Sequence, residues 1–79
     1  MNKIYWEVRR YNYREDEVDT MYEGKRDGAI RFFHKSIAEN KDKEICYVLN
    51  KWVSKRYWDG RGWSFEESEI EEQYEEGGI

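Results

Sequence analysis

Apolar and polar positions alternate with a period of two over residues 3–13. Ile4, Trp6 and Val8 fall on one side of this segment, while charged and tyrosine side chains occupy the other. A period of two is typical of a β-strand that buries one face and exposes the other. We therefore expect the chain to begin with a strand whose outer face is polar and lined with tyrosines.

The segment that follows predicts a second strand. The acidic residues 15–17 interrupt the alternation, and residues 18–23 resume it with Val18, Thr20 and Tyr22 on a shared face. Two alternating segments separated by a polar stretch indicate a β-hairpin with a longer loop.

Residues 27–39 change to a helical period. Their apolar positions recur at a spacing of three to four residues, which predicts an amphipathic helix with one buried stripe. Asp27 lies near its expected start and Asn40 is suited to its C-terminal end. The stripe consists of Ala29, Ile30, Phe33 and Ile37.

Residues 45–53 fit both a buried strand and a helix, because the run ICYVL is continuous and the apolar spacing beyond it is also helical. The β-branched and aromatic content favours the strand. Residues 54–65 then predict a hairpin that turns at Asp59–Gly62, with Trp58 and Trp63 facing each other across it.

Together these segments predict an α+β fold in the order β-β-α-β-β. We expect a small antiparallel sheet of about four strands, with one amphipathic helix packed on one face and the 54–65 hairpin closing an edge. The expected contacts join Ile30, Phe33 and Ile37 of the helix to Ile4, Trp6, Val8, Ile45, Tyr47 and Leu49 of the sheet.

The C-terminal residues 66–79 look like an acidic tail attached to a single domain of residues 1–65. Ser64 and Glu67 have the spacing of a helical capping box, but only Ile70 and Tyr74 offer apolar contacts. We expect a frayed helix or a disordered end. Truncation after Phe65 is then expected to leave the melting temperature nearly unchanged.

Composition places the chain among small folded proteins. It has 79 residues, 41% charged and 18% aromatic, and the aromatic rings can supply a core where aliphatic residues are scarce. The single cysteine, Cys46, has no disulfide partner in the chain, and no apolar run approaches the roughly 20 residues of a membrane span. We expect a cytoplasmic protein with neither signal peptide nor membrane contact.

The net charge of −4 hides an asymmetry along the chain. Residues 64–79 carry seven glutamates and no lysine or arginine, so residues 1–63 hold 14 cations against 11 carboxylates. Such a division marks an interaction tail, a tail folded back on its own basic body, or a solubilising end.

The residue inventory argues against an enzyme. Cys46 lies in an apolar run typical of a buried thiol, and His34 lies at the edge of the helical stripe. One cysteine and one histidine are too few for a tetrahedral zinc site. We therefore expect no catalytic residues, no metal and no cofactor.

The leading functional hypothesis is a protein-binding module. Carboxylates spread over a small surface can imitate a phosphate backbone, with exposed tyrosines as anchors, as in small inhibitors or adaptors of phages and mobile elements. The expected partner is a protein with a basic, nucleic-acid-binding site. The candidate contact residues are Tyr11, Tyr13, Glu15, Asp16, Glu17, Glu66, Glu67, Glu71 and Glu72.

Two other functions compete with this hypothesis. Cations interleave with aromatic residues over residues 51–63, the pattern of a surface for single-stranded nucleic acid. A structural homodimer formed by pairing of sheet edges is the other alternative. The candidate nucleic-acid contacts are Lys55, Arg56, Tyr57, Trp58 and Arg61.

Overall fold

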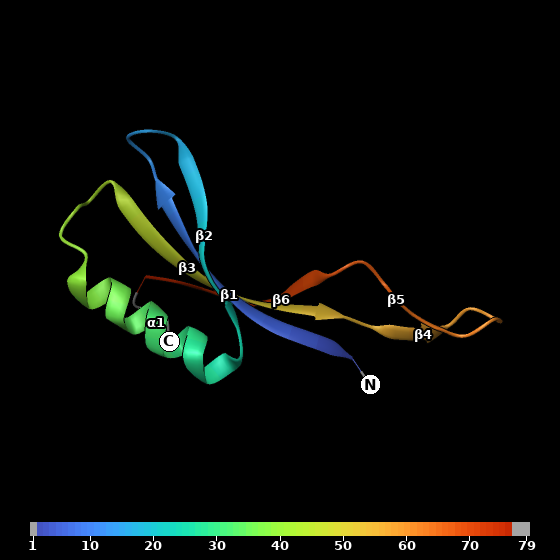
Figure 1. Ribbon diagram of the computed structural model, residues 1–79. Coiled ribbons are helices and arrows are strands. Elements are labelled where there is room, and N and C mark those ends of the chain that lie inside the picture. The colour runs from blue at the N-terminus through green and yellow to red at the C-terminus, as the bar shows by residue number, and fades with distance from the viewer. Residues whose placement is uncertain (1, 77–79) are drawn as a thin grey trace.

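The computed structural model describes residues 2–76, which form an α+β fold (Figure 1). A four-stranded antiparallel sheet has the strand order β2-β1-β3-β6, and one helix covers one of its faces. Strands β4 and β5 form a separate two-stranded ladder. The elements in chain order are β1 (Lys3–Asn12), β2 (Glu17–Gly24), α1 (Arg26–Glu39), β3 (Ile45–Ser54), β4 (Arg56–Trp58), β5 (Trp63–Phe65) and β6 (Glu69–Glu75).

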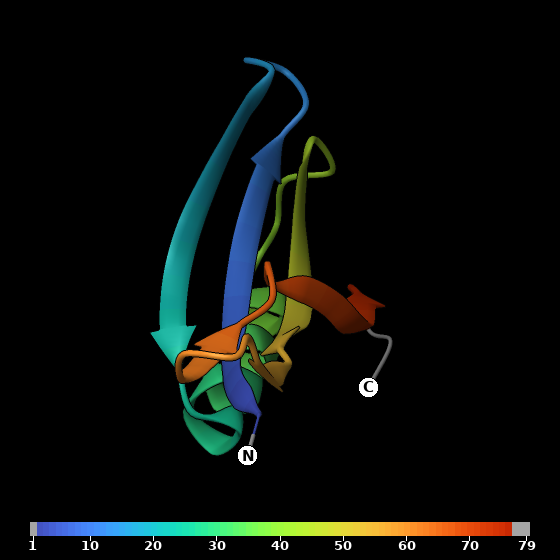
Figure 2. The same cartoon turned by 90° about the vertical axis from the view of Figure 1, so that its right-hand side faces the viewer.

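Strands β1 and β3 form the centre of the sheet. They pair antiparallel over ten residues, from Lys3 opposite Ser54 to Asn12 opposite Ile45. Figure 2 shows β2 on the outer side of β1 and β6 on the outer side of β3. The expectation of a strand over residues 45–53 is therefore confirmed.

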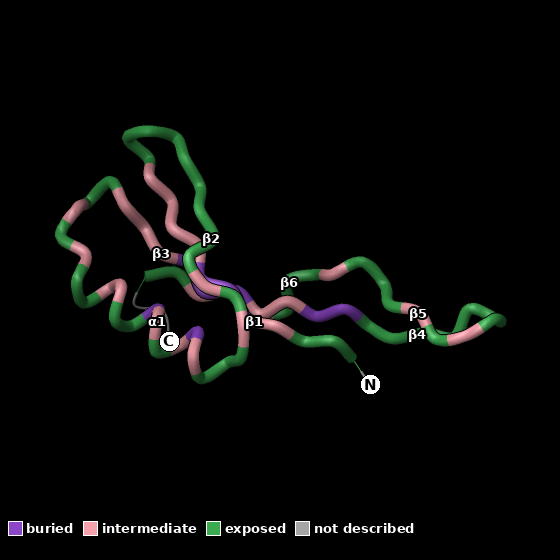
Figure 3. The backbone as a smooth tube through the Cα atoms, in the orientation of Figure 1, coloured by how far each residue is buried: buried purple, intermediate pink, exposed green. Residues whose placement is uncertain are grey.

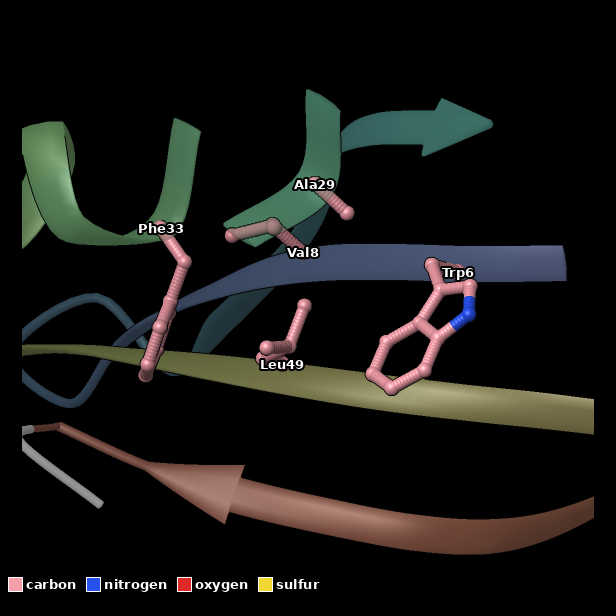
Figure 4. Close-up of a cluster of buried hydrophobic side chains, with 5 residues drawn as sticks. All are labelled: Trp6, Val8, Ala29, Phe33 and Leu49. Carbon is pink, nitrogen blue, oxygen red and sulfur yellow. The ribbon is translucent and has the colours of Figure 1, made fainter. Parts of the chain in front are cut away.

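The core lies between this central pair and α1. Trp6 and Val8 from β1 and Leu49 from β3 meet Ala29 and Phe33 of the helix, and all five are buried (Figure 4). Burial of each large apolar side chain contributes about 1.5–3 kcal/mol to folding. With five buried side chains the core is small, as expected for a chain of this length.

Ile4 is an exception to the predicted core, because it is 52% exposed. Strand β2 ends opposite Trp6, where Gly24 pairs with it, and the chain turns there into α1. Ile4 therefore lies beyond the part of the sheet that the helix covers. At the covered end, Gly28 allows close packing, because a Cβ at this position would collide with the Tyr22 hydroxyl.

A β-bulge in β2 changes which of its side chains face the helix. Tyr22 pairs with Val8 and faces the helix, but Thr20 pairs with the next residue, Arg9, on the opposite face. The extra residue, Met21, shifts the alternation by one position. The expectation that Val18, Thr20 and Tyr22 share a face is therefore wrong for Tyr22.

The expected acidic tail is also wrong for residues 69–75, which form strand β6 along β3. The pairing runs from Glu69 opposite Val53 to Glu75 opposite Val48. The Gln73 amide donates a hydrogen bond to Asn50 Oδ1 (2.9 Å), and Tyr74 packs against the core. The free backbone edge of β3 supplies hydrogen-bond partners for residues 69–75. A count of apolar side chains does not reveal these partners. Residues 77–79 of the predicted tail lie outside the described residues.

The predicted hairpin forms, but it does not close an edge of the sheet. Trp58 pairs with Trp63 as expected, and the Glu66 N–H donates to the Lys55 carbonyl at 2.8 Å. Strands β4 and β5 thus extend the β3–β6 hairpin away from the body as an arm, defined here as residues 55–65 (Figure 1). The radius of gyration is 15.1 Å, against about 11.6 Å for a compact domain of this length.

The pairing of β6 predicts that truncation after Phe65 destabilises the protein. The truncated chain loses the Tyr74 packing and leaves Asn50 and the outer edge of β3 without partners. The free energy of unfolding should fall by about 3 kcal/mol or more, measured by urea denaturation. A chain ending at Glu76 is the control, and an unchanged midpoint for the shorter chain would contradict the role of β6.

Candidate functional site

The glutamate-rich segment lies at one edge of the sheet. Among the described residues no strand pairs with the outer side of β6. The Lys51 ammonium donates to Glu71 Oε1 at 3.0 Å and lies 3.7 Å from Glu72 Oε2. Hydrogen bonding to Glu71 raises the pKa of Lys51 above its ordinary value. Glu66 and Glu67 are exposed between β5 and β6.

The other predicted acidic residues lie at the tip of the β1–β2 hairpin. Glu15 and Asp16 occupy the turn, and Glu17 begins β2. Tyr11 and Tyr13 stack beside them with ring centroids 6.4 Å apart, and Tyr13 is largely exposed. The two predicted tyrosines and the first acidic cluster therefore form one local surface.

The structure does not bring the two acidic clusters together. The Tyr13 N–H donates to the Glu44 carbonyl, just before β3, whereas the Glu66 N–H donates to the carbonyl of Lys55, just after it. Ten residues of extended strand separate these points, a length of about 33 Å. Glu66 and Glu67 consequently lie at the end of β3 far from the hairpin tip, whereas Glu71 and Glu72 lie beside Lys51, between the two ends.

The predicted nucleic-acid contacts lie together on the arm. Arg56 pairs with Phe65 and Trp58 pairs with Trp63, so these four side chains share one face, while Tyr57 lies on the other face. Trp58 and Trp63 are each 59% exposed and Phe65 is 50% exposed. Figure 3 shows that exposed residues make up most of the arm, in contrast to the buried centre of the sheet.

Cation and aromatic side chains contact each other on this face. The Trp58 and Trp63 rings meet edge to face, with centroids 5.6 Å apart, and the Arg56 guanidinium lies 4.2 Å from the Trp63 centroid. Trp63 and Phe65 belong to this face as well, although neither is among the predicted nucleic-acid contacts. The alternation across the turn identifies both, because residues opposite Trp58 and Arg56 must share their face.

The turn of the arm is held by Asp59. Its Oδ1 accepts the N–H groups of Arg61 (2.8 Å) and Gly62 (3.0 Å), and its Oδ2 accepts the Ser64 hydroxyl (3.1 Å). The backbone bonds from Arg61 and Gly62, followed by the Ser64 bond, lower the pKa of Asp59. Gly60 has a φ of 92°, a conformation that glycine adopts without strain.

A buried carboxylate lies on the sheet face opposite the helix, and the sequence analysis missed it. Glu7 is only 3% exposed, and its Oε1 accepts hydrogen bonds from Trp52 Nε1 (2.8 Å) and Asn50 Nδ2 (3.2 Å). Thr20 donates to its Oε2 at 3.4 Å. The side chains around Glu7 thus connect the three strands β2, β1 and β3, and Gln73 extends the connection to β6 through Asn50.

Arg9 supplies the opposite charge for Glu7. Its Nε lies 2.8 Å from Glu7 Oε1, although its N–H does not point at the oxygen. Burial lowers the pKa of Arg9, but the Tyr11 hydroxyl and the Glu7 carboxylate together outweigh this effect and raise it. The guanidinium also lies over Trp52, which stacks on Tyr5. This pairing compensates a buried charge that would otherwise be costly.

Cys46 and His34, the residues considered for catalysis and metal binding, contact neighbouring backbone and apolar groups. Cys46 is half-buried, its thiol contacts the Tyr47 carbonyl at 3.7 Å, and burial raises its pKa, which favours the unreactive thiol form. His34 is exposed on α1 with its ring against Phe33. Within residues 2–76, no group of three or more potential ligand side chains is arranged to hold a metal ion.

Removal of the Glu7 carboxylate should destabilise the sheet. Glu7→Leu leaves Trp52 Nε1, Asn50 Nδ2 and the Arg9 charge without their acceptor, and we expect a loss of about 2–4 kcal/mol in urea denaturation. Glu23→Leu is the matched control, because Glu23 pairs with Glu7 on the next strand but is exposed. Equal losses in the two variants would contradict the role of the Glu7 hydrogen bonds.

As the pH falls, the turn of the arm should loosen earlier in the wild type than in an Asp59→Asn variant. Because the folded-state pKa of Asp59 is lowered, its contribution is present above the ordinary carboxyl pKa, about 3.9, and is lost as the pH falls through the lowered value. Circular dichroism of the coupled Trp58–Trp63 pair measures this change. The signal should hold down to about pH 4 and decline below it; an identical acid profile in Asp59→Asn would contradict the assignment.

No protein-family model, no curated protein and no solved structure matches the chain. In the described part of the chain, no helix is long and apolar enough to cross a membrane.

Proposed function

We propose that this chain is a non-enzymatic protein-binding module that places its acidic edge on a basic, nucleic-acid-binding surface of a partner protein. The acidic edge is defined as strand β6 together with Glu66, Glu67 and Glu76. The observation that carries the proposal is the pairing of β6 with β3, because it holds the glutamates along an extended strand. A row of carboxylates held in this way loses less conformational entropy on binding than a disordered tail.

The spacing of these charges supports a phosphate-like role. Four glutamates lie within the seven residues of β6, and six steps of strand span about 20 Å. Including Glu71 and Glu72, which also pair with Lys51, this is about one charge every 6 Å, within a factor of two of the 3.4 Å repeat of charges along one DNA strand. A basic groove that receives the whole edge, with Glu69 and Glu72 on the helix side of the sheet and Glu75 on the other side, would therefore meet carboxylates at usable intervals.

The positions of the other acidic residues narrow the proposal. The hairpin tip with Glu15, Asp16 and Glu17 lies about 33 Å along β3 from Glu66, but the edge runs back toward it, because Glu75 pairs with Val48, three residues from the start of β3. Glu71 and Glu72 are partly neutralised by Lys51. The exposed carboxylates that remain for a partner are Glu66, Glu67, Glu69, Glu75 and Glu76.

The same charges disfavour a homodimer formed by edge pairing. Strand β6 carries four glutamates, and the opposite edge strand, β2, carries Glu17, Asp19 and Glu23. Either strand would bring like charges together if it paired with its own copy. A partner with a basic surface removes this repulsion, which favours the protein-binding alternative.

Affinity capture from lysate at low salt, followed by mass spectrometry, tests the proposal. The wild-type chain should retain nucleic-acid-binding proteins, and duplex DNA or added salt should release them. The edge variant combines Glu66→Gln, Glu67→Gln, Glu69→Gln and Glu75→Gln, which leaves the Lys51 pairs intact. Retention by this variant should fall at least about tenfold.

The control removes the same number of charges from the opposite edge strand β2 and its turn, through Glu15→Gln, Asp16→Asn, Glu17→Gln and Glu23→Gln. It should retain the captured proteins. The proposal is wrong if the wild-type chain captures none of these proteins at low salt, or if the edge variant keeps all of them.

A further inference from the structure

We propose that the arm binds single-stranded nucleic acid, with Trp58 and Trp63 stacking on bases and with Lys55, Arg56 and Arg61 contacting phosphates. This inference concerns a different surface from the acidic edge and does not rest on the function proposed above. It starts from the position of the arm, which extends away from the body and from its helix (Figures 1 and 3).

The aromatic side chains of the arm are not needed by the core. Trp58, Trp63 and Phe65 are at least half exposed, and the buried cluster is formed entirely by β1, α1 and β3. In an edge-to-face pair, one ring keeps both of its faces clear of its partner, and the Arg56 guanidinium lies over only one face of Trp63, so at least one indole face stays open. Such a face is a stacking surface for an unpaired base.

The charge of the arm favours an anionic ligand. Residues 55–65 contain three cations and one carboxylate, Asp59, whose oxygens already accept bonds from the turn. Two copies of the arm facing each other would oppose six cations, so a second copy of this chain is a poor occupant. Cations beside exposed indoles match the phosphates and unstacked bases of a single strand, whereas bases in a duplex are already stacked.

The acidic edge leaves the tip of the arm accessible to such an anion. Arg61 is five residues from Glu66 along the ladder, a separation of about 16 Å. This exceeds the Debye length of about 8 Å at physiological salt, so repulsion from the edge is largely screened at the tip. Lys55, whose carbonyl accepts a hydrogen bond from the Glu66 N–H, lies closer to the edge. Repulsion between the edge and an anion is therefore screened less at Lys55.

Fluorescence anisotropy with labelled oligo(dT) and oligo(rU) of about 15 nucleotides tests the proposal on the intact chain. Binding should weaken as salt rises, with a slope of log K against log salt near −2, because each contacted phosphate of a single strand contributes about −0.7. Tryptophan emission should be quenched on binding. Glu66→Gln with Glu67→Gln should tighten binding by about twofold, because a repulsion near Lys55 is removed.

Arm variants separate stacking from charge. Trp58→Ala should weaken binding by about 5-fold to 150-fold, while Trp58→Phe should retain most of it. Arg56→Gln with Arg61→Gln should reduce the salt slope by about 1.4. The matched control, Arg31→Gln with Lys35→Gln on the exposed side of α1, should leave both affinity and slope unchanged. Melting temperatures should match the wild type throughout, because these side chains lie outside the core.

Four results would overturn the proposal. The first is the absence of an anisotropy change at low salt with up to about 100 µM protein. The second is an equal loss of binding in the arm and helix charge variants, and the third is an unchanged affinity in Trp58→Ala. The fourth is an arm that is needed to retain a captured protein but not to bind either oligonucleotide, which would assign the arm to a protein contact.

Discussion

The ten-residue ladder between β1 and β3 is the interaction on which the rest of the structure depends. One face of this pair supplies Trp6, Val8 and Leu49 to the helix, and the other supplies Glu7, Asn50 and Trp52 to a buried hydrogen-bonded group. Within residues 2–76, both outer strands pair only with this central pair. A chain of this size has one small core, so a single ladder has to organise both faces of the sheet.

The arrangement of charge follows from this central pair. Cations such as Arg9 and Lys51 lie on the two inner strands, while carboxylates line the two outer strands. Each outer ladder also contains an irregularity, between Val8 and Arg9 on one side and between Lys51 and Trp52 on the other. Charged side chains and bulges on edge strands oppose further strand addition. The glutamate-rich composition thus has a structural role as well as a proposed functional one.

The arm has no comparable structural role. It continues the β3–β6 hairpin past the end of the sheet and away from α1, and its base contacts the residue before β1 through the Arg56 N–H, which donates to Asn2 Oδ1 at 3.4 Å. Asp59 accepts hydrogen bonds from the backbone N–H groups of its turn. Its tryptophans nevertheless remain exposed, in a protein whose core is short of large apolar residues. Exposed aromatic side chains beside cations are typical of binding surfaces rather than of folding contacts.

The sequence by itself determined the elements whose signals are local. The alternation in residues 3–13, the helical stripe of residues 27–39 and the turn at Asp59–Gly62 each appear in the structure where the pattern predicted them. It also determined that Trp58 would meet Trp63, because a short turn sets the pairing of its flanking residues. These features depend on backbone conformation and neighbouring side chains alone.

Only the tertiary structure decided the place of residues 69–75 and the burial of Glu7. Strand β6 has few apolar side chains, and it forms because β3 offers an unpaired backbone edge, which no pattern within residues 66–76 records. Glu7 is buried because Arg9, Asn50, Trp52 and Thr20 converge on it from three strands. Both outcomes depend on groups distant in the chain, so the apparent acidic tail became an edge of the sheet and the hairpin became a projecting arm.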